Sequence, residues 1–220
     1  TLPNQRDRRW RRFDERERAM IDAILAHPRL RHWFIENRDE VLPRTSSLPL
    51  GYVFMHGESD LIEVPPLATP LAERPLRAFC AHRERAGPQW DTRRRVSALC
   101  RREWSDVADL VEEELPLDRF RQALRRYPFA LCVQGGGLDP APKAWLAPVE
   151  GTIPVIRSSP LDDAYAELPV AIVDEWRADC LDMERLAGWR ERLAPQFDDP
   201  ALRSAVLSKL TLDYWWGKVE

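Results

Sequence analysis

Three consecutive glycines directly after an apolar run are the most informative feature of the sequence. The run is Phe129-Ala130-Leu131-Cys132-Val133, and the loop after it reads Gln134-Gly135-Gly136-Gly137-Leu138-Asp139. Glycine loses much conformational entropy on folding, so three in a row indicate a positive φ or a backbone that lies directly against another group. At the end of a buried strand, that group is often a phosphate. The loop therefore predicts a phosphate-binding turn, with a plain tight turn as the alternative.

Polar side chains downstream of this loop would suit an anionic ligand. Pro140 and Pro142 predict a helix start, where free N–H groups favour an anion, and Lys143 adds a positive charge in the first turn. Ser158 and Ser159 follow the next apolar run. Their hydroxyls could bind phosphate oxygens or only cap a helix.

The loop after an earlier apolar run, residues 76–81, begins with His82 and Arg83. An arginine can hold a diphosphate with two hydrogen bonds, although a lone arginine more often faces solvent. For His82 we expect an ordinary hydrogen-bonded role. No metal-binding pattern accompanies these residues, because the sequence has no His-Glu-x-x-His motif, no zinc spacing and no Asp-x-Asp motif. We therefore expect no metal.

The elements that position these loops alternate between strand and helix. Apolar runs at 76–81, 129–133, 153–156 and 170–173 predict strands, and residues 107–111 a further strand or a helical turn. Segments with helical spacing separate them, among them Asp91–Arg102 and Asp118–Arg126. This alternation predicts an α/β fold with a parallel, Rossmann-like, doubly wound sheet. Ligands of that fold bind at the carboxyl ends of the strands, where the loops above begin.

Composition argues against two broad classes of partner. The 220 residues include 33 Lys and Arg against 36 Asp and Glu, so no overall positive field favours nucleic acid. The arginines between positions 5 and 18 alternate with acids, as on a solvated helix face, with a phosphate-binding patch as the alternative. No run approaches the roughly 20 apolar residues of a transmembrane helix. We expect no nucleic-acid partner and no membrane span in this chain.

The cysteines lie far apart, without the paired spacing of a zinc or redox site. Buried thiols in a reducing, cytoplasmic compartment are the favoured reading. A location in the Golgi lumen would need an anchor upstream of Thr1. The four residues are Cys80, Cys100, Cys132 and Cys180.

Several segments together resemble the exostosin-type glycosyltransferases and the related ribitol xylosyltransferase-like proteins. The resemblance covers residues 75–196 well and extends weakly to 32–52 and 210–216. It implies a GT-B arrangement, in which two Rossmann-like halves face each other across a cleft and the second half binds a nucleotide sugar without a metal. The segments that carry it are Tyr127 to Asp139, Lys143-Ala144-Trp145, Gly151 to Ile156, Ser158-Ser159-Pro160-Leu161-Asp162 and Leu168-Pro169-Val170.

The resemblance also implies a division of the chain. Residues 1–56 would be the end of a preceding, acceptor-side Rossmann-like half, and the proline-rich residues 57–74 a linker. Residues 75–196 would form the nucleotide-sugar-binding domain, and 197–220 a C-terminal docking helix, which we expect to run from Ala201 to Tyr214.

Carried over to this sequence, the family pattern makes Gly135–Gly137 the diphosphate loop, with Asp139 and Lys143 as its polar partners. Ser158 and Ser159 would lie near the sugar or the phosphates, and Arg83 near the diphosphate. The general base of such enzymes normally comes from the first half, so no catalytic residue is assigned here.

One position departs from the family pattern. The family usually has Glu directly after the tryptophan, where it binds the ribose hydroxyls of the donor, and this sequence has Leu146. Losing a buried carboxylate–ribose contact would cost about 2–4 kcal/mol of donor affinity. Glu150, one helical turn further on, is a candidate substitute.

We therefore expect a glycosyltransferase that uses a nucleotide-diphosphate sugar as donor and a glycan or other hydroxyl as acceptor, with no separate cofactor. The alternative is a catalytically decayed binding or scaffolding domain, because Leu146 removes the expected ribose contact.

Overall fold

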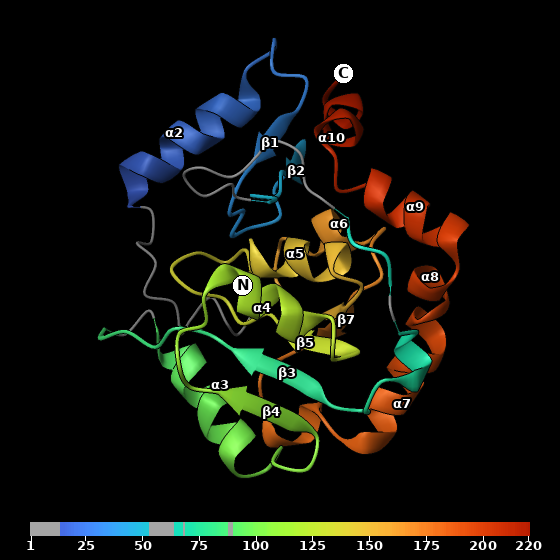
Figure 1. Ribbon diagram of the computed structural model, residues 1–220. Helices are drawn as coiled ribbons and strands as arrows, with labels where there is room; N and C mark the ends of the chain where they lie inside the picture. Colours follow the sequence, from blue (N-terminus) through green and yellow to red (C-terminus); the bar gives the residue numbers. More distant parts are fainter. Residues whose placement is uncertain (1–13, 53–63, 68, 88–89) are drawn as a thin grey trace.

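The computed structural model of the chain describes residues 14–52, 64–67, 69–87 and 90–220. Its centre is a five-stranded, all-parallel β-sheet in the order β4-β3-β5-β6-β7 (Figure 1). The strands are β3 (Ala78–Ala81), β4 (Ala108–Val111), β5 (Phe129–Leu131), β6 (Ile153–Arg157) and β7 (Ala171–Val173). Because the order reverses between β3 and β5, this is a doubly wound sheet with its switch point there. The predicted Rossmann-like α/β fold is confirmed, and residues 107–111 prove to be a strand.

The sheet is buried on both faces, as its apolar runs predicted. Every residue of β3 and β5 is buried, and the register pairs Ala78 with Ala108 on one side and with Phe129 on the other. A strand covered on both faces needs apolar side chains in both directions, so its sequence reads as an unbroken apolar run.

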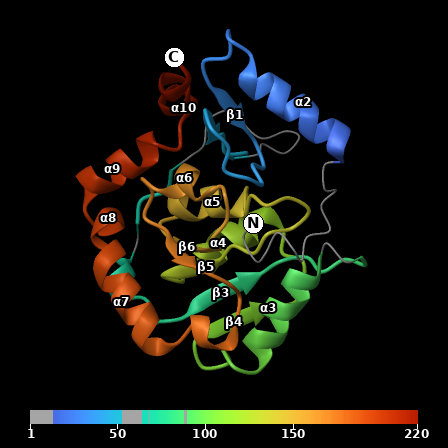
Figure 2. The same ribbon diagram turned by 180° about the vertical axis from the view of Figure 1, so that it is seen from behind.

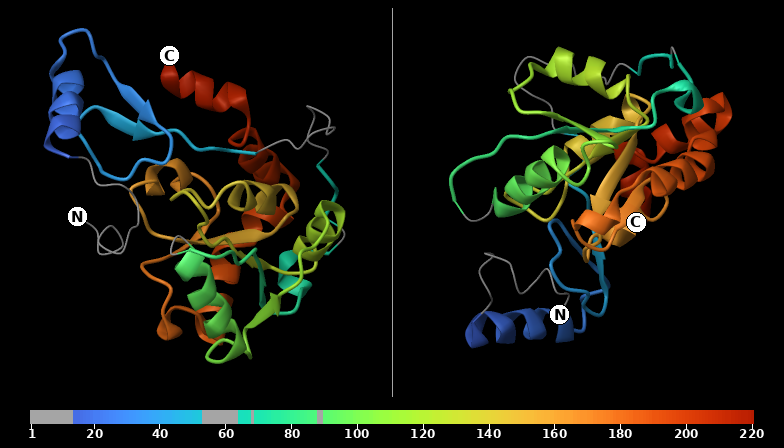
Figure 3. Two further views of the ribbon diagram at one scale, coloured as in Figure 1. Left: turned by 90° about the vertical axis from the view of Figure 1, so that its left-hand side faces the viewer. Right: turned by 90° about the horizontal axis from the view of Figure 1, so that it is seen from below.

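Two helical layers cover the two faces of the sheet (Figure 3). Helices α3 (Asp91–Arg101), α7 (Met183–Leu193) and α8 (Pro195–Asp198) contribute to one core cluster, together with Trp104 and Trp176. Helices α4 (Leu117–Leu124), α5 (Lys143–Val149) and α6 (Asp162–Tyr165) contribute to the other, which includes Trp145. Short 3-10 helices at Leu71–Glu73 and Ala178–Cys180 complete this part of the chain.

The N-terminal segment forms a small unit of its own beside the sheet (Figures 1 and 3). It comprises α2 (Glu15–Ala26) and the parallel pair β1 (Trp33–Ile35) and β2 (Thr45–Ser47). A capping box between Asp14 and Glu17 starts α2. The apolar side chains of α2 remain largely unburied, with Met20 58% and Ile24 43% exposed.

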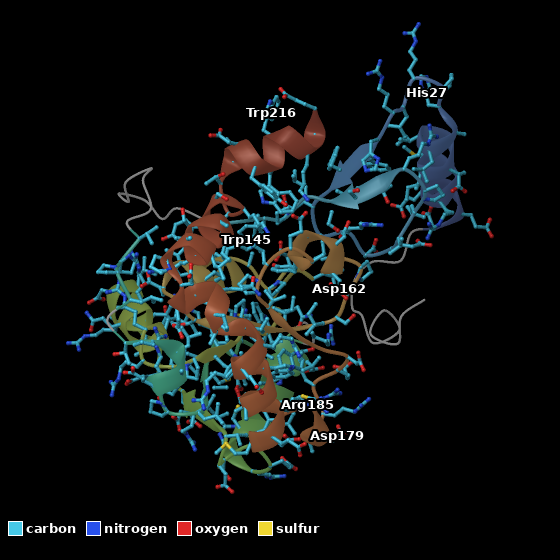
Figure 4. The ribbon with its side chains drawn as sticks, turned by 90° about the vertical axis from the view of Figure 1, so that its right-hand side faces the viewer. His27, Trp145, Asp162, Asp179, Arg185 and Trp216 are labelled. Atoms are coloured by element: carbon cyan, nitrogen blue, oxygen red, sulfur yellow. The ribbon has the colours of Figure 1, made fainter. Side chains whose placement is uncertain are left out.

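The C-terminal segment differs from the prediction. Helices α7, α8, α9 (Pro200–Ser208) and α10 (Leu212–Val219) form an arc along one side of the sheet (Figure 2). The continuous helix expected from Ala201 to Tyr214 is interrupted, because Thr211 caps a new helix through a hydrogen bond from the Tyr214 N–H to its Oγ1 (3.3 Å). Trp215 then packs edge-on against Trp145, while Trp216 points outward (Figure 4).

Part of the expected division lies outside the described residues, namely 1–13, 53–63 and 68. Within the described part of the chain, no helix combines the length and the apolar character that crossing a bilayer requires.

Candidate functional site

The loops after β3 and β5 meet at the switch point of the sheet, and Arg93 joins them. Arg93 lies in the first turn of α3, and its guanidinium donates from Nε to the Gln134 carbonyl (3.2 Å) and from Nη1 to the Arg83 carbonyl (3.0 Å). The same group stacks on the Trp90 ring, 4.7 Å from its centroid. Arg93, which the sequence analysis did not single out, thus links the backbone of Arg83 to the glycine loop.

Lys143 completes this cluster from the other side. It is the first residue of α5, and its Nζ donates to the carbonyl of Ala81, the last residue of β3. The ammonium also lies 5.9 Å from the centre of the Phe120 ring, within reach of a cation–π interaction. Lys143 thus reaches the switch point, close to where the strand-end loops diverge.

Both cations are partly desolvated. Burial, together with the neighbouring Arg85 and Arg83, lowers the pKa of Arg93 to about 10, so it remains charged at neutral pH. Burial also lowers the pKa of Lys143. Among the described residues neither side chain forms an ion pair with a carboxylate; their partners are backbone carbonyls.

The three glycines have three different surroundings. A Cβ on Gly135 would lie 2.5 Å from Nη2 of Arg93, and one on Gly137 would lie 2.4 Å from Oδ1 of Asn37. No described atom lies within 4 Å of a Cβ built on Gly136, which is exposed. The absence of a side chain at Gly135 and Gly137 therefore leaves room for Arg93 and Asn37, and of the three glycines only Gly136 has no described neighbour at its Cβ position.

A cavity of about 400 Å³ opens at the carboxyl ends of β3 and β4, within the range of ligand pockets. Phe120, whose ring lies beside Lys143, forms part of its wall. The rim is of mixed charge, and Arg83, expected near a diphosphate, is exposed and forms an ion pair with Glu114. The remaining lining is residues 81–85 and 112–115.

Asp139 lies at the junction between the glycine loop and the N-terminal unit. Its carboxylate accepts hydrogen bonds from the N–H of Leu50 (2.9 Å), the N–H of Ala141 (2.9 Å) and the hydroxyl of Tyr165 (2.5 Å). Burial and Asp139 raise the pKa of Tyr165 well above its usual value, so the phenol stays protonated and donates. Asp139 is 5% exposed, and these contacts hold the loop to the rest of the molecule.

Ser158 and Ser159 lie one strand further along, after β6. The Ser158 hydroxyl donates to Asp162 (2.6 Å), and the Ser159 N–H donates to the same carboxylate (2.8 Å). The Ser159 Oγ in turn accepts from the Leu161 N–H (3.1 Å). These bonds hold the turn that precedes α6, and the helix itself has no side-chain cap among the described residues, so the pair does not act as the helix cap that was the alternative prediction. Figure 4 shows Asp162 on the side of the domain that faces the N-terminal unit.

Glu150 lies away from the cluster formed by Arg93, Lys143 and the glycine loop. Helix α5 ends at Val149, and Glu150 lies near the amino end of β6, at the opposite edge of the sheet from Lys143. Its fully buried carboxylate is held by Nε of Arg121 and Nε of Arg125, each at 2.5 Å. Leu146 is 5% exposed and packs in the core.

Two polar residues at the site were not singled out from the sequence. Gln134 is 4% exposed, and its Oε1 accepts from Trp176 Nε1 (3.4 Å), but its Nε2 finds no acceptor among the described residues. The sequence around Asn37 gives no indication of its role, because its distinguishing feature is a backbone φ of 51°, which only the structure shows. Arg93 could have been found, because it follows a strand-end loop in the first turn of the next helix.

The thiols are buried, as expected. Cys80 Sγ lies 3.7 Å from Nδ1 of His82, whose Nε2 lies 3.1 Å from the Arg93 carbonyl and 3.0 Å from Ser97 Oγ. A carbonyl only accepts, so Nε2 carries the proton. A hydrogen bond with Cys100 lowers the pKa of Cys80 to about 5 against the effect of burial. His82 therefore has the ordinary hydrogen-bonded role expected of it.

No three His, Cys, Asp or Glu side chains in the described ranges are grouped so as to hold a metal ion. The chain matches no model of a known protein family, and no curated protein matches it.

Proposed function

We propose that this chain is the nucleotide-sugar-binding half of a metal-independent glycosyltransferase, which transfers a sugar from a nucleoside diphosphate to an acceptor hydroxyl. The observation that carries the proposal is the pair of desolvated cations, Arg93 and Lys143, at the switch point of the sheet. A buried charge is normally paired, because burial without a partner costs free energy. A bound diphosphate would supply the negative charge that the described carboxylates do not provide.

The open space beside Gly136 and the cavity beside Phe120 would suit such a ligand. The diphosphate would lie over exposed Gly136, between Arg93 and Lys143, and the nucleoside would extend toward the 400 Å³ cavity beside Phe120. During transfer the acceptor oxygen would bond to the anomeric carbon as the bond to the diphosphate oxygen breaks, and the hydroxyl proton would pass to a general base, which in such enzymes normally comes from the first half. The two cations would then stabilise the charge that develops on the departing diphosphate.

Calorimetric titration tests the binding step. Nucleoside diphosphates and their sugar derivatives are titrated into the chain with a chelator present, using wild type and Lys143→Met. Replacing the ammonium by a thioether of similar length removes one charge-assisted contact, which should weaken binding at least about tenfold. Lys218→Met is the matched control, because Lys218 pairs with Glu167 on the surface. If no nucleoside diphosphate binds at millimolar concentration, or if Lys143→Met binds as well as wild type, the proposal fails.

The second candidate is a binding domain without turnover, and the surroundings of Leu146 and Glu150 favour it. Leu146 is buried in the core, and Glu150 is held by two arginines at the far edge of the sheet, so neither supplies the ribose carboxylate of the family pattern. The two functions separate in an assay for sugar release or transfer from a donor that binds. Binding without either reaction would favour the second candidate.

A further inference from the structure

Two neighbouring N–H groups of the glycine loop converge on a single oxygen. The N–H of Leu138 lies 3.0 Å from Oδ1 of Asn37, and the N–H of Asp139 lies 3.2 Å from the same atom. Successive backbone N–H groups that point at one oxygen form the kind of concavity that binds anions. In this structure the oxygen belongs to a neutral amide of the N-terminal unit.

The loop is shaped around that amide oxygen. Gly137 has no room for a Cβ, because Asn37 Oδ1 would lie only 2.4 Å from it. Gly137 does not itself have a positive φ, so close approach is what requires glycine at this position.

The backbone at Asn37 has an unusual conformation where its side chain reaches the loop. Asn37 has a φ of 51°, a conformation that side-chain-bearing residues seldom adopt and that costs free energy unless surrounding contacts hold it. Three hydrogen bonds hold the segments around Asn37 in place: Arg38 Nη1 to Asp163 (2.8 Å), the Ser47 N–H to the same carboxylate (3.0 Å), and the Leu50 N–H to Asp139.

We propose that the N–H groups of Leu138 and Asp139 form an oxyanion site for a diphosphate oxygen, and that Asn37 occupies it as an internal competitor until the ligand arrives. The diphosphate identity rests on the function proposed above; the competition does not. A phosphate oxygen carries negative charge and accepts stronger hydrogen bonds from these N–H groups than a neutral amide does. Ligand binding then displaces Asn37 and loosens the N-terminal unit from the loop.

If Asn37 competes with the ligand, removing its amide should raise ligand affinity, whereas a purely structural role for Asn37 predicts no such gain. Asn37→Gly removes the amide oxygen, and glycine adopts the required φ without strain, so the fold is kept. With the competitor gone, affinity for inorganic pyrophosphate should rise about tenfold, the net value of the hydrogen bonds that the ligand no longer has to break. Asn37→Asp keeps the acceptor and adds a negative charge, and should lower the affinity by a similar factor. Ser46→Gly, an uncharged change elsewhere in the same unit, should leave it unchanged.

Hydrogen exchange supplies the second measurement. If Asn37 weakens ligand binding, thermodynamic linkage requires that a bound ligand weakens the contact between Asn37 and the loop by the same factor. Saturating pyrophosphate should therefore raise deuterium uptake over residues 33–47 of the wild-type chain, whereas simple stabilisation by a ligand would lower it.

The outcomes separate this inference from the proposed function. Equal or lower pyrophosphate affinity in Asn37→Gly, or no binding to either form at millimolar concentration, overturns the inference. If nucleotide sugars bind wild type and Asn37→Gly equally, the proposed function stands and the competition falls. If Asn37→Gly gains pyrophosphate affinity while no nucleotide sugar binds, the oxyanion site stands and the proposed function falls.

Discussion

Neutralising Glu150 should destabilise the fold strongly and leave ligand binding intact. The change is Glu150→Gln, which preserves the shape of the side chain. The native carboxylate is fully buried, and each of its oxygens lies 2.5 Å from an arginine Nε, that of Arg121 or of Arg125. The substitution leaves the two cations facing a neutral amide.

The size of the effect follows from how much water each partner can reach. Breaking a buried ion pair by removing one partner costs about 3–5 kcal/mol. Here the buried charge itself is removed, and the arginine side chains are 23% and 42% exposed, so part of their hydration is recovered. We therefore expect a loss of about 3 kcal/mol in the free energy of unfolding, or roughly 6–12 °C in Tm for a chain of this size.

Urea unfolding followed by tryptophan fluorescence measures the loss, with Glu167→Gln as the control. Glu167 pairs with Lys218 at the surface, where an ion pair contributes little, so the control midpoint should not move. Nucleotide affinity of folded Glu150→Gln should equal that of wild type. A midpoint unchanged from wild type would refute the reasoning about burial. A specific loss of nucleotide affinity would instead support Glu150 as the substitute ribose contact.

Three further changes have defined outcomes. Gly188 lies inside α7 with no described atom within 4 Å of a built Cβ, so Gly188→Ala should raise the free energy of unfolding by about 0.5–1 kcal/mol in the same urea assay. The ion pair with Arg77 lowers the pKa of Asp109, so this pair stabilises the fold above the ordinary carboxyl pKa and the contribution is lost as pH falls through the lowered value. Asp109→Asn should therefore show a smaller drop in urea midpoint between pH 7 and pH 3 than wild type does. A thiol-specific reagent should label the native chain only after unfolding, despite the low pKa of one thiol, because all four cysteines are buried: Cys80, Cys100, Cys132 and Cys180.

The sheet was predictable because its signal is local. A strand covered on both faces must be apolar over consecutive residues. The runs that begin at Phe129 and Ile153 have this property, and both form buried strands. The break between α9 and α10 was missed for the opposite reason. The apolar spacing continues through it, and only the capping hydroxyl of Thr211 marks the new helix.

The site was predictable in part because strand-end loops of a parallel sheet converge on one edge. That rule predicts that Arg83, the glycine loop and Lys143 follow strands at the same edge. It could not find Asn37, which lies 101 positions before Leu138 in the sequence and reaches the loop only through tertiary contacts. Nor could helical spacing place Glu150, since extrapolating one turn from Leu146 assumes a helix that in fact ends at Val149.

A glycine-rich motif can suggest a larger ligand contact than the structure supports. Three consecutive glycines, considered together, suggest one ligand that lies against the whole loop. Gly135 instead admits the Arg93 guanidinium, and Gly137 admits the Asn37 amide, so two of the three are required by contacts within the chain. Among the three, only Gly136 has no described atom within 4 Å of a built Cβ. A substitution series separates these roles. Gly136→Ala should fold normally and affect only ligand affinity. Gly137→Ala places its Cβ 2.4 Å from the position of Asn37 Oδ1, so it should keep both the amide and a phosphate oxygen away from the two N–H groups and should not show the affinity gain expected of Asn37→Gly.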